Sequence, residues 1–293
     1  MRHVVDQLID ERSEGLRSRP WLWRLITSLF YPILGYERAK TLVDQVQNLS
    51  GEEVLDSVSS QLQLKVSTSG LEHLPTRGRA MLVANHPAGI ADGIAVYDAI
   101  KHLREDVVIF ANRDAVRMAP GLASHIIPVE WIEEKRTRAQ QRDMIRQIVA
   151  AFRAEKLVVI FPSGRLAYLK WSGLTERPWQ TTAVNLAQKY CCEIIPMHIN
   201  ARNSLLFYAV SLISDELRDI TLFHELMNKR NKTYRLNIGA PIDPAGDVRE
   251  VTDALEHYVT QQLSKGDAHC TALRKPPHRT APQTPDPIDL KTT

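Results

Sequence analysis

Six short apolar runs that alternate with helical patterns are the feature that most constrains the fold of this chain. The runs lie at 62–67, 80–84, 107–110, 157–161, 193–199 and 233–239, and the helical patterns at about 93–104, 138–154, 179–190, 214–230 and 247–263. Strands that alternate with helices are typically joined by crossover connections, which place neighbouring strands parallel. The order therefore predicts an α/β fold with a mixed, largely parallel sheet flanked by helices.

The sequence on either side of this alternation has a different character. Residues 37–60 show polar helical patterns with Gly51 between them, and from Lys265 onward the chain is rich in Pro, Thr and basic residues without periodicity. Such a composition is typical of a disordered tail. We therefore expect an N-terminal helical segment over 1–60, an α/β domain over 61–264 and a disordered tail over 265–293.

Composition excludes several classes of protein. With 44% hydrophobic and 24% charged residues, the chain has ordinary globular composition. Its net charge of +3 gives no electrostatic indication of a nucleic-acid partner. The three cysteines have no ligand-like spacing, and no dinucleotide-type glycine loop or P-loop occurs. We expect no metal site, no bound cofactor and no nucleic-acid partner.

The most apolar stretch, residues 21–35, leaves two interpretations open. It is too short for one straight membrane-spanning helix, which needs about 20 residues. It is either a core helix or an interfacial anchor in which Trp21, Trp23 and Phe30 contact the membrane at headgroup level. Because the N-terminus lacks the pattern of a secretory signal, we expect a cytoplasmic protein, peripherally associated with the inner face of the cell membrane.

A histidine and an aspartate directly follow the apolar run 80–84. Asn85 and His86 come first, Asp92 lies six positions after His86, and a helical pattern begins there. Ligands bind at the carboxyl ends of strands in α/β sheets, and Pro and Gly between the two residues permit a compact turn. In a His–Asp pair, the carboxylate stabilises the imidazolium while the second ring nitrogen accepts a proton from a hydroxyl. The sequence thus predicts a catalytic dyad of His86 and Asp92.

The run 157–161 ends in a second polar turn. Its residues are Phe161, Pro162, Ser163, Gly164 and Arg165. Backbone amides and a guanidinium in such a turn can hold an anion or a developing oxyanion. Ser163 lacks the Gly-x-Ser-x-Gly elbow of hydrolases, which argues against a serine triad.

Taken together, these blocks resemble the glycerol-phosphate and lysophospholipid acyltransferase superfamily. Asn85, His86 and Asp92 match its Asn-His…Asp block, and 161–164 is similar to its Phe-Pro-Glu-Gly block, with Ser163 in place of the glutamate. Residues 195–199 are similar to its later Pro-centred strand. The five residues between His86 and Asp92, where most members have four, resemble the haemolysin-like and ornithine-lipid O-acyltransferase branch.

This resemblance implies transfer of a fatty acyl chain from acyl-CoA or acyl-carrier protein to a hydroxyl of a lysolipid, such as a lysophospholipid or lyso-ornithine lipid. His86 would be the base and Asp92 its partner. Arg113 ranks before Arg117, Arg136 and Arg138 as a substitute for the arginine of the family's second block. Substrate contacts are expected from Asn85, Gly89, Gly93, Arg113, Phe161, Pro162, Ser163, Gly164 and Arg165.

Two alternatives remain open at this point. The first is an acyl-thioester hydrolase that uses the same site with water as the acceptor. The second is a non-catalytic module that binds a lipid or acyl-carrier protein.

Overall fold

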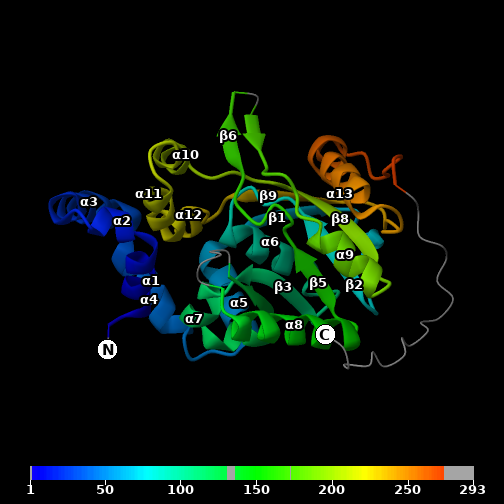
Figure 1. Ribbon diagram of the computed structural model, residues 1–293, viewed down its shortest axis with the longest axis horizontal. Coiled ribbons are helices and arrows are strands. Elements are labelled where there is room, and N and C mark those ends of the chain that lie inside the picture. The colour runs from blue at the N-terminus through cyan, green and yellow to red at the C-terminus, as the bar shows by residue number, and fades with distance from the viewer. Residues whose placement is uncertain (1, 131–135, 172, 274–293) are drawn as a thin grey trace.

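A computed structural model describes residues 2–130, 136–171 and 173–273 (Figure 1). A seven-stranded sheet in the order β1-β9-β8-β2-β5-β3-β4 forms its centre. The strands are β1 (Lys65–Ser69), β2 (Ala80–Ala84), β3 (Val107–Asn112), β4 (Ile126–Val129), β5 (Leu157–Ile160), β8 (Glu193–Asn200) and β9 (Thr233–Ile238). Every neighbouring pair is parallel except β8 with β9. The predicted mixed, largely parallel sheet is confirmed.

Helices cover both faces of the sheet, which explains why its central strands are apolar throughout. On one face, Leu82 of β2 packs in a cluster with α5 (Gly51–Leu62) and α6 (Ile90–Ile100). On the other face, Met81 and Val83 pack with the second group of helices. That group contains α8 (Arg138–Arg153), α9 (Thr182–Lys189) and α13 (Val248–His257). Burial on both sides is characteristic of parallel strands joined through helices.

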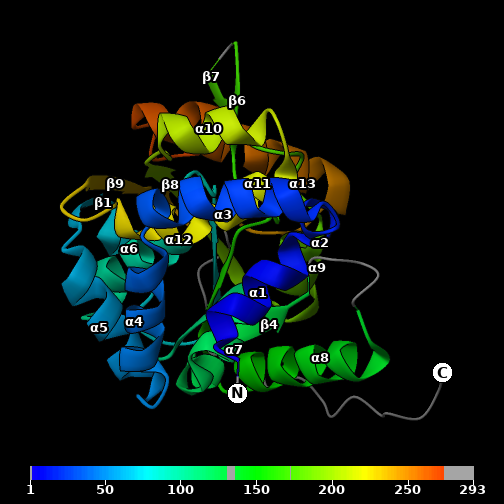
Figure 2. The same ribbon diagram turned by 90° about the vertical axis from the view of Figure 1, so that its left-hand side faces the viewer.

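The N-terminal helices lie together at one side of the molecule (Figures 1 and 2). They are α1 (Val4–Arg12), α2 (Glu14–Arg17), α3 (Pro20–Leu34) and α4 (Tyr36–Val46). α3 ends at Gly35, whose φ of +68° suits a residue without a Cβ. Within the described ranges, no helix has both the length and the apolar character needed to cross a membrane.

Several elements differ from the sequence prediction. The helix expected over 214–230 is two helices, α11 (Asp215–Ile220) and α12 (Leu222–Met227), with the Thr221 hydroxyl bound to the Arg218 carbonyl between them. Further elements were not expected because they are too short to show a period. These are β4, α7 (Asp114–Met118), α10 (Leu205–Ser211) and the hairpin of β6 (Tyr168–Lys170) and β7 (Gly173–Thr175).

The structure also bears on the expected segment boundaries. α5 packs against the sheet and runs through the boundary expected at 60, because Leu55, Val58 and Leu62 belong to the cluster of the α/β unit. At the other end, the Ala240 N–H donates to the Ala268 carbonyl, so the chain remains in contact with the domain beyond 265. Residues 274–293 of the expected tail lie outside the described residues.

A buried ion pair fixes the segment that follows β8. Lys229 Nζ lies 2.9 Å from Glu225 Oε2 and also donates to Asn203 Oδ1 at 2.9 Å. Glu225 in turn accepts from the N–H and the hydroxyl of Ser204, at the start of α10. Burial raises the pKa of Glu225, but the hydrogen bonds from Ser204 and Lys229 outweigh this effect and leave its pKa below the ordinary value. The pair therefore positions α10 relative to α12.

Replacement of this lysine should destabilise the fold. Lys229→Met leaves the Glu225 carboxylate buried without its cation, and breaking such a pair costs about 3–5 kcal/mol. We expect that loss in the free energy of unfolding near pH 7, measured by urea denaturation. The loss should shrink in acid, because burial without the cation makes Glu225 take up a proton at higher pH. Lys232→Met, at an exposed position, is the matched control, and an equal effect of both variants would contradict the assignment.

Candidate active site

Segments from distant parts of the chain meet at one edge of the sheet. β2 is parallel to β5 and β8, and β3 is parallel to β5, so their carboxyl ends lie on the same edge. The turn after β2 and the turn after β5 are joined directly, because the Ala167 N–H donates to the His86 carbonyl at 3.1 Å. This edge brings together the residues that the two sequence motifs single out.

The His86 and Asp92 side chains are in contact. His86 Nδ1 lies 3.0 Å from Asp92 Oδ2, and the Asp92 side chain is fully buried. The same oxygen accepts hydrogen bonds from the backbone N–H groups of Ala88 at 2.8 Å and Gly89 at 2.9 Å. The turn therefore holds the carboxylate in place, and the contact becomes an ion pair when the imidazole gains a proton. Nε2, on the opposite side of the ring, is the nitrogen left for a reacting group.

Phe161 covers one face of the imidazole. The two ring centroids are 4.4 Å apart with an angle of 24° between the planes, and Phe161 is itself buried. An offset stack of this kind restricts rotation of the ring and keeps water from that face. Phe161 is thus a positioning residue for His86, supplied by the strand next to β2.

Asn85 serves the fold at the base of the site. Its Nδ2 donates to the Ile199 carbonyl at 3.0 Å, and its Oδ1 accepts from the Ile199 N–H at 2.6 Å. Both polar ends of the side chain are therefore engaged with β8. Asn85 ties the end of β2 to β8 and so fixes where His86 begins, which differs from the substrate contact expected from the sequence.

Two glycines keep the entrance to the dyad open. Gly89 has a φ of +87°, and a Cβ at this position would lie 3.1 Å from Leu166 Cδ2. Gly93 lies in the first turns of α6, where the nearest atom to an added Cβ would be Ile109 Cδ1 at 4.0 Å. Both line the cavity described below. Their small size leaves room for substrate beside His86.

The turn after β5 is closed by its own hydrogen bonds. Ser163 Oγ donates to the Arg165 carbonyl at 2.9 Å, and the Gly164 N–H donates to the Phe161 carbonyl at 3.0 Å. The Pro162 carbonyl accepts from the Gln180 N–H. Ser163 is buried, so its hydroxyl stabilises the turn. Arg165 is exposed and lines the cavity, which makes its guanidinium the group of this turn best placed to meet an anion.

The other candidate arginines have different surroundings. Arg113 follows β3, lines the cavity and lies 3.9 Å from Glu130 Oε2. Arg117 forms two 2.7 Å hydrogen bonds with Glu11 of α1, and Arg136 Nε donates to the Glu130 carbonyl. Arg138 is exposed at the first position of α8. Arg113 keeps its place as the first candidate for binding an anionic group.

An open cavity of about 2060 Å³ lies in front of the dyad. His86, Phe161 and Gly164 line one part of it, and apolar residues of α5, α6 and α12 such as Val58, Ile94 and Leu226 line another. Drug-sized sites occupy roughly 300–1,000 Å³, so this cavity has room for more than one long apolar chain. Its lining suits a substrate that is mostly hydrocarbon.

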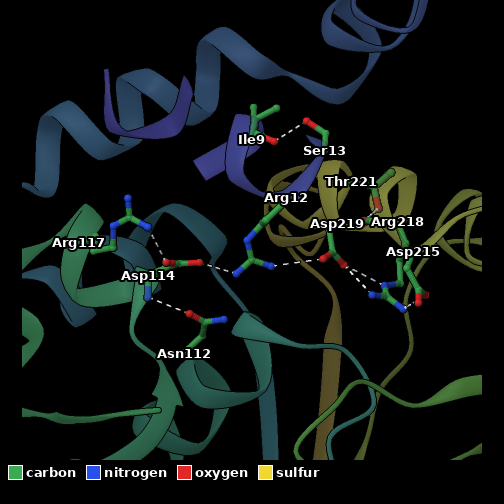
Figure 3. A network of polar contacts seen from close by, with 10 residues as sticks. All are labelled: Ile9, Arg12, Ser13, Asn112, Asp114, Arg117, Asp215, Arg218, Asp219 and Thr221. Atoms are coloured by element: carbon green, nitrogen blue, oxygen red, sulfur yellow. Dashed lines mark hydrogen bonds and ion pairs between the residues drawn. The ribbon is translucent and has the colours of Figure 1, made fainter. Parts of the chain in front are cut away.

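An ion-pair network joins the N-terminal helices to the wall of this cavity (Figure 3). Arg12 of α1 reaches Asp114 of α7 at 2.5 Å and Asp219 of α11 at 3.5 Å. Arg117 pairs with Asp114 from α7 itself, and Arg218 pairs with Asp219. All five side chains line the cavity, so α1 forms part of its boundary.

Glu176 is a site residue that the sequence analysis missed. Its Oε1 accepts the His86 backbone N–H at 2.6 Å, and its Oε2 accepts the Trp179 indole N–H at 3.0 Å. Burial raises the pKa of Glu176 above its ordinary value, and the two hydrogen bonds only partly offset this effect. It follows the β6–β7 hairpin, in a polar stretch without any pattern that would mark it. Among the described residues, no group of His, Cys, Asp and Glu has the arrangement of a metal site.

Comparison with known proteins agrees with this geometry. Residues 65–200, which contain both turns and the strands beneath them, match the family model described as Acyltransferase. The chain therefore contains an acyltransferase domain over these residues, of the kind found in the glycerolipid acyltransferase superfamily. It is an O-acyltransferase, so the superfamily and the class of enzyme predicted from the sequence are confirmed.

Two curated relatives match most of the chain. The lyso-glycine lipid O-acyltransferase of Phocaeicola vulgatus is 29% identical over 238 residues, which are 79% of this chain and 83% of the relative. The protein of the same name from Bacteroides thetaiotaomicron is 22% identical over 244 residues, 81% of this chain and 87% of the relative. The crystal structure of the 1-acyl-sn-glycerophosphate acyltransferase PlsC from Thermotoga maritima has a TM-score of 0.47 and 13% identity, covering 92% of this chain and 99% of that one.

Glu176→Gln tests whether this carboxylate positions the base. The amide nitrogen cannot accept a hydrogen bond, so either His86 or Trp179 loses its partner, at a cost of about 1–3 kcal/mol. We expect kcat for acyl transfer to fall by about tenfold, with little change in KM. A loss of about 1.4 kcal/mol in transition-state stabilisation corresponds to a tenfold lower rate.

Glu256→Gln is the matched control. Glu256 accepts the backbone N–H of the same Trp179 but is not bonded to His86. It should lower thermal stability without lowering kcat. Equal kinetic effects of the two variants would show that only general stability is involved.

Proposed function

We propose that this enzyme moves a fatty acyl group from a thioester, acyl-CoA or acyl-carrier protein, to the hydroxyl of a lysolipid, with His86 as the general base. The observation that carries the proposal is the 3.0 Å contact between His86 and the buried Asp92 at the end of a large apolar cavity. Such a cavity suits the acyl chains of both donor and acceptor. The contact supplies the base that the acceptor hydroxyl needs.

In the proposed reaction, His86 Nε2 takes the proton of the acceptor hydroxyl as its oxygen attacks the thioester carbonyl carbon. The C–O bond forms, the carbonyl electrons move to oxygen, and the Arg165 guanidinium stabilises that oxyanion. The carbon–sulfur bond then breaks, and the imidazolium returns its proton to the departing thiolate. Asp92 stabilises the imidazolium throughout. Ser163 takes no part as a nucleophile, because its hydroxyl is committed to the Arg165 carbonyl.

The acceptor in this proposal carries an anionic headgroup. Both curated relatives are named for a lyso-glycine lipid, and a glycine headgroup can present a carboxylate. Arg113 lines the cavity, and arginine forms paired hydrogen bonds with carboxylates and phosphates. Arg113 suits a carboxylate headgroup, and a phosphate acceptor is the second candidate in the assay below.

The site of action in this proposal is the inner face of the cell membrane, where a lysolipid acceptor resides. Trp21, one of the three membrane-contacting residues expected from the sequence, is 70% exposed on α3. Trp23 and Phe30 pack instead against the cluster that α1, α3, α4 and α11 share. Peripheral contact therefore rests on the exposed side of α3.

His86→Ala should lower turnover by a factor on the order of 100 or more while the protein stays folded, because a positioned general base contributes about that much. The assay follows labelled acyl-CoA and acyl-carrier protein with a lyso-glycine lipid, a lysophospholipid and no acceptor. His102→Ala, at an exposed histidine, is the control and should retain wild-type turnover. Near-normal turnover of His86→Ala contradicts the proposed base, and thioester consumption without lipid product indicates a hydrolase.

Arg113 and Arg165 should differ in their kinetic effects. Arg113→Ala removes a charged hydrogen bond to the headgroup, worth about 1.5–3 kcal/mol, and should raise KM for the carboxylate acceptor by about tenfold or more. A neutral monoacylglycerol should show no such change. Arg165→Ala should lower kcat for both acceptors. Arg138→Ala is the surface control, and an unchanged acceptor KM in Arg113→Ala would exclude its proposed role.

A further inference from the structure

Large apolar side chains that face solvent are concentrated on three segments of the described chain. The members are Trp21, Leu25, Leu29 and Ile33 on α3, Leu169, Trp171 and Leu174 on the β6–β7 hairpin, and Leu205, Leu212 and Ile213 in and after α10. These make up ten of the thirteen exposed large hydrophobic residues, the others being Ile90, Leu103 and Ile145. Scattered single residues are normal on protein surfaces, but such a concentration marks an interaction site.

The three segments share one side of the molecule although they are far apart in the sequence. In Figure 1, α3, α10 and the strands of the β6–β7 hairpin follow the upper left edge. In Figure 2, which faces that edge, α10 lies above α3 in a similar direction, and the hairpin rises beyond both. The two views agree, so the segments form one apolar surface, here called the α3–α10–hairpin surface.

The spacing of the exposed apolar residues shows which side of α3 faces solvent. Trp21, Leu25, Leu29 and Ile33 recur every fourth residue, which places them along one side of the helix. Ile26 and Leu34 face the opposite way and are buried in the cluster with α1 and α4. The four exposed residues take no part in this packing, so the packing of the core does not account for them.

Basic groups border this surface. Arg19 and Arg24 are exposed at the start of α3. At the hairpin, Lys170 Nζ and the Arg177 guanidinium lie 5.3 and 5.5 Å from the centre of the Tyr168 ring. Exposed Trp and Leu with flanking Lys and Arg form the combination that binds the headgroup level of an anionic bilayer.

The cavity connects this surface with His86. Leu169, Leu205 and Leu212 are exposed on the surface and at the same time line the cavity. A lipid that enters between the hairpin and α10 can therefore keep its hydrocarbon tail out of water along the whole path. A protein partner seated on the same residues would instead close that entrance.

We infer that the α3–α10–hairpin surface docks on an anionic lipid bilayer, with the hairpin tip at headgroup level and the cavity open toward the membrane. The docking itself is independent of the chemistry at His86. The consequence, that the lysolipid acceptor enters from the bilayer, rests on the proposed function. Trp171, which is fully exposed near the tip, is the residue that most directly reports on the docking.

The test is co-sedimentation with vesicles of phosphatidylcholine, alone or with phosphatidylglycerol. Wild type should bind the anionic vesicles more strongly, and Trp171→Ser, Ile213→Ser and Leu25→Ser should each reduce the partition coefficient by about tenfold, as expected for one large side chain removed from the interface. Ile145→Ser removes an apolar side chain from α8 that is 54% exposed, close to the 50% of Leu25, and should bind like wild type. The inference is overturned if Trp171→Ser binds the vesicles as strongly as Ile145→Ser does. It is also overturned if the protein forms a dimer without lipid and the same substitutions dissociate that dimer.

A second measurement separates this inference from the proposed function. With a short-chain, water-soluble acceptor, Trp171→Ser should keep wild-type turnover, whereas with the acceptor embedded in vesicles its turnover should fall with its binding. If the proposed acyl transfer is wrong, neither acceptor is consumed but the binding defect remains. Equal turnover of Trp171→Ser and wild type on vesicle-embedded acceptor contradicts entry from the bilayer.

Discussion

The site depends above all on the burial of the Asp92 carboxylate. A buried carboxyl group needs hydrogen-bond donors, and here the N–H groups of Ala88 and Gly89 converge on Oδ2, the oxygen that also faces His86. This requirement explains the tight turn between β2 and α6, with a positive φ at Gly89, and the amide of Asn85 that anchors the turn to β8. The turn that supplies these donors to Oδ2 thus also sets how the Asp92 carboxyl group faces His86.

His86 is held from three further directions by parts of the chain that follow β5. Phe161 stacks on the ring, the Ala167 N–H binds the His86 carbonyl, and Glu176 accepts the His86 N–H. The segment between Ala167 and Glu176 is the β6–β7 hairpin, whose tip belongs to the proposed membrane surface. The same excursion of the chain therefore supports His86 at both of its ends and carries part of the proposed membrane surface between them.

Sequence patterns located the fold and the dyad because both depend on short-range signals. The apolar run 80–84 coincides with β2, and the turn that follows it contains both members of the dyad. Glu176 could not be identified from the sequence because its partner, the His86 N–H, lies 90 positions away and its neighbours show no periodicity. The sequence alone does not decide which aromatic residues of α3 face solvent. Trp23 and Phe30 pack against the side that α1 and α4 cover, whereas Trp21 is exposed.

The Arg12 network also determines the order in which the molecule can be assembled. Its two partners lie 102 and 207 positions later in the chain, at Asp114 and Asp219. A contact cannot form before both of its segments have been synthesised, and contacts of long sequence separation form slowly. During synthesis, α1 therefore emerges first but cannot complete its contacts until α11 has followed it. Until then the apolar residues of α1 that pack beside α11 stay uncovered, and transiently exposed apolar surface of this kind promotes aggregation during synthesis.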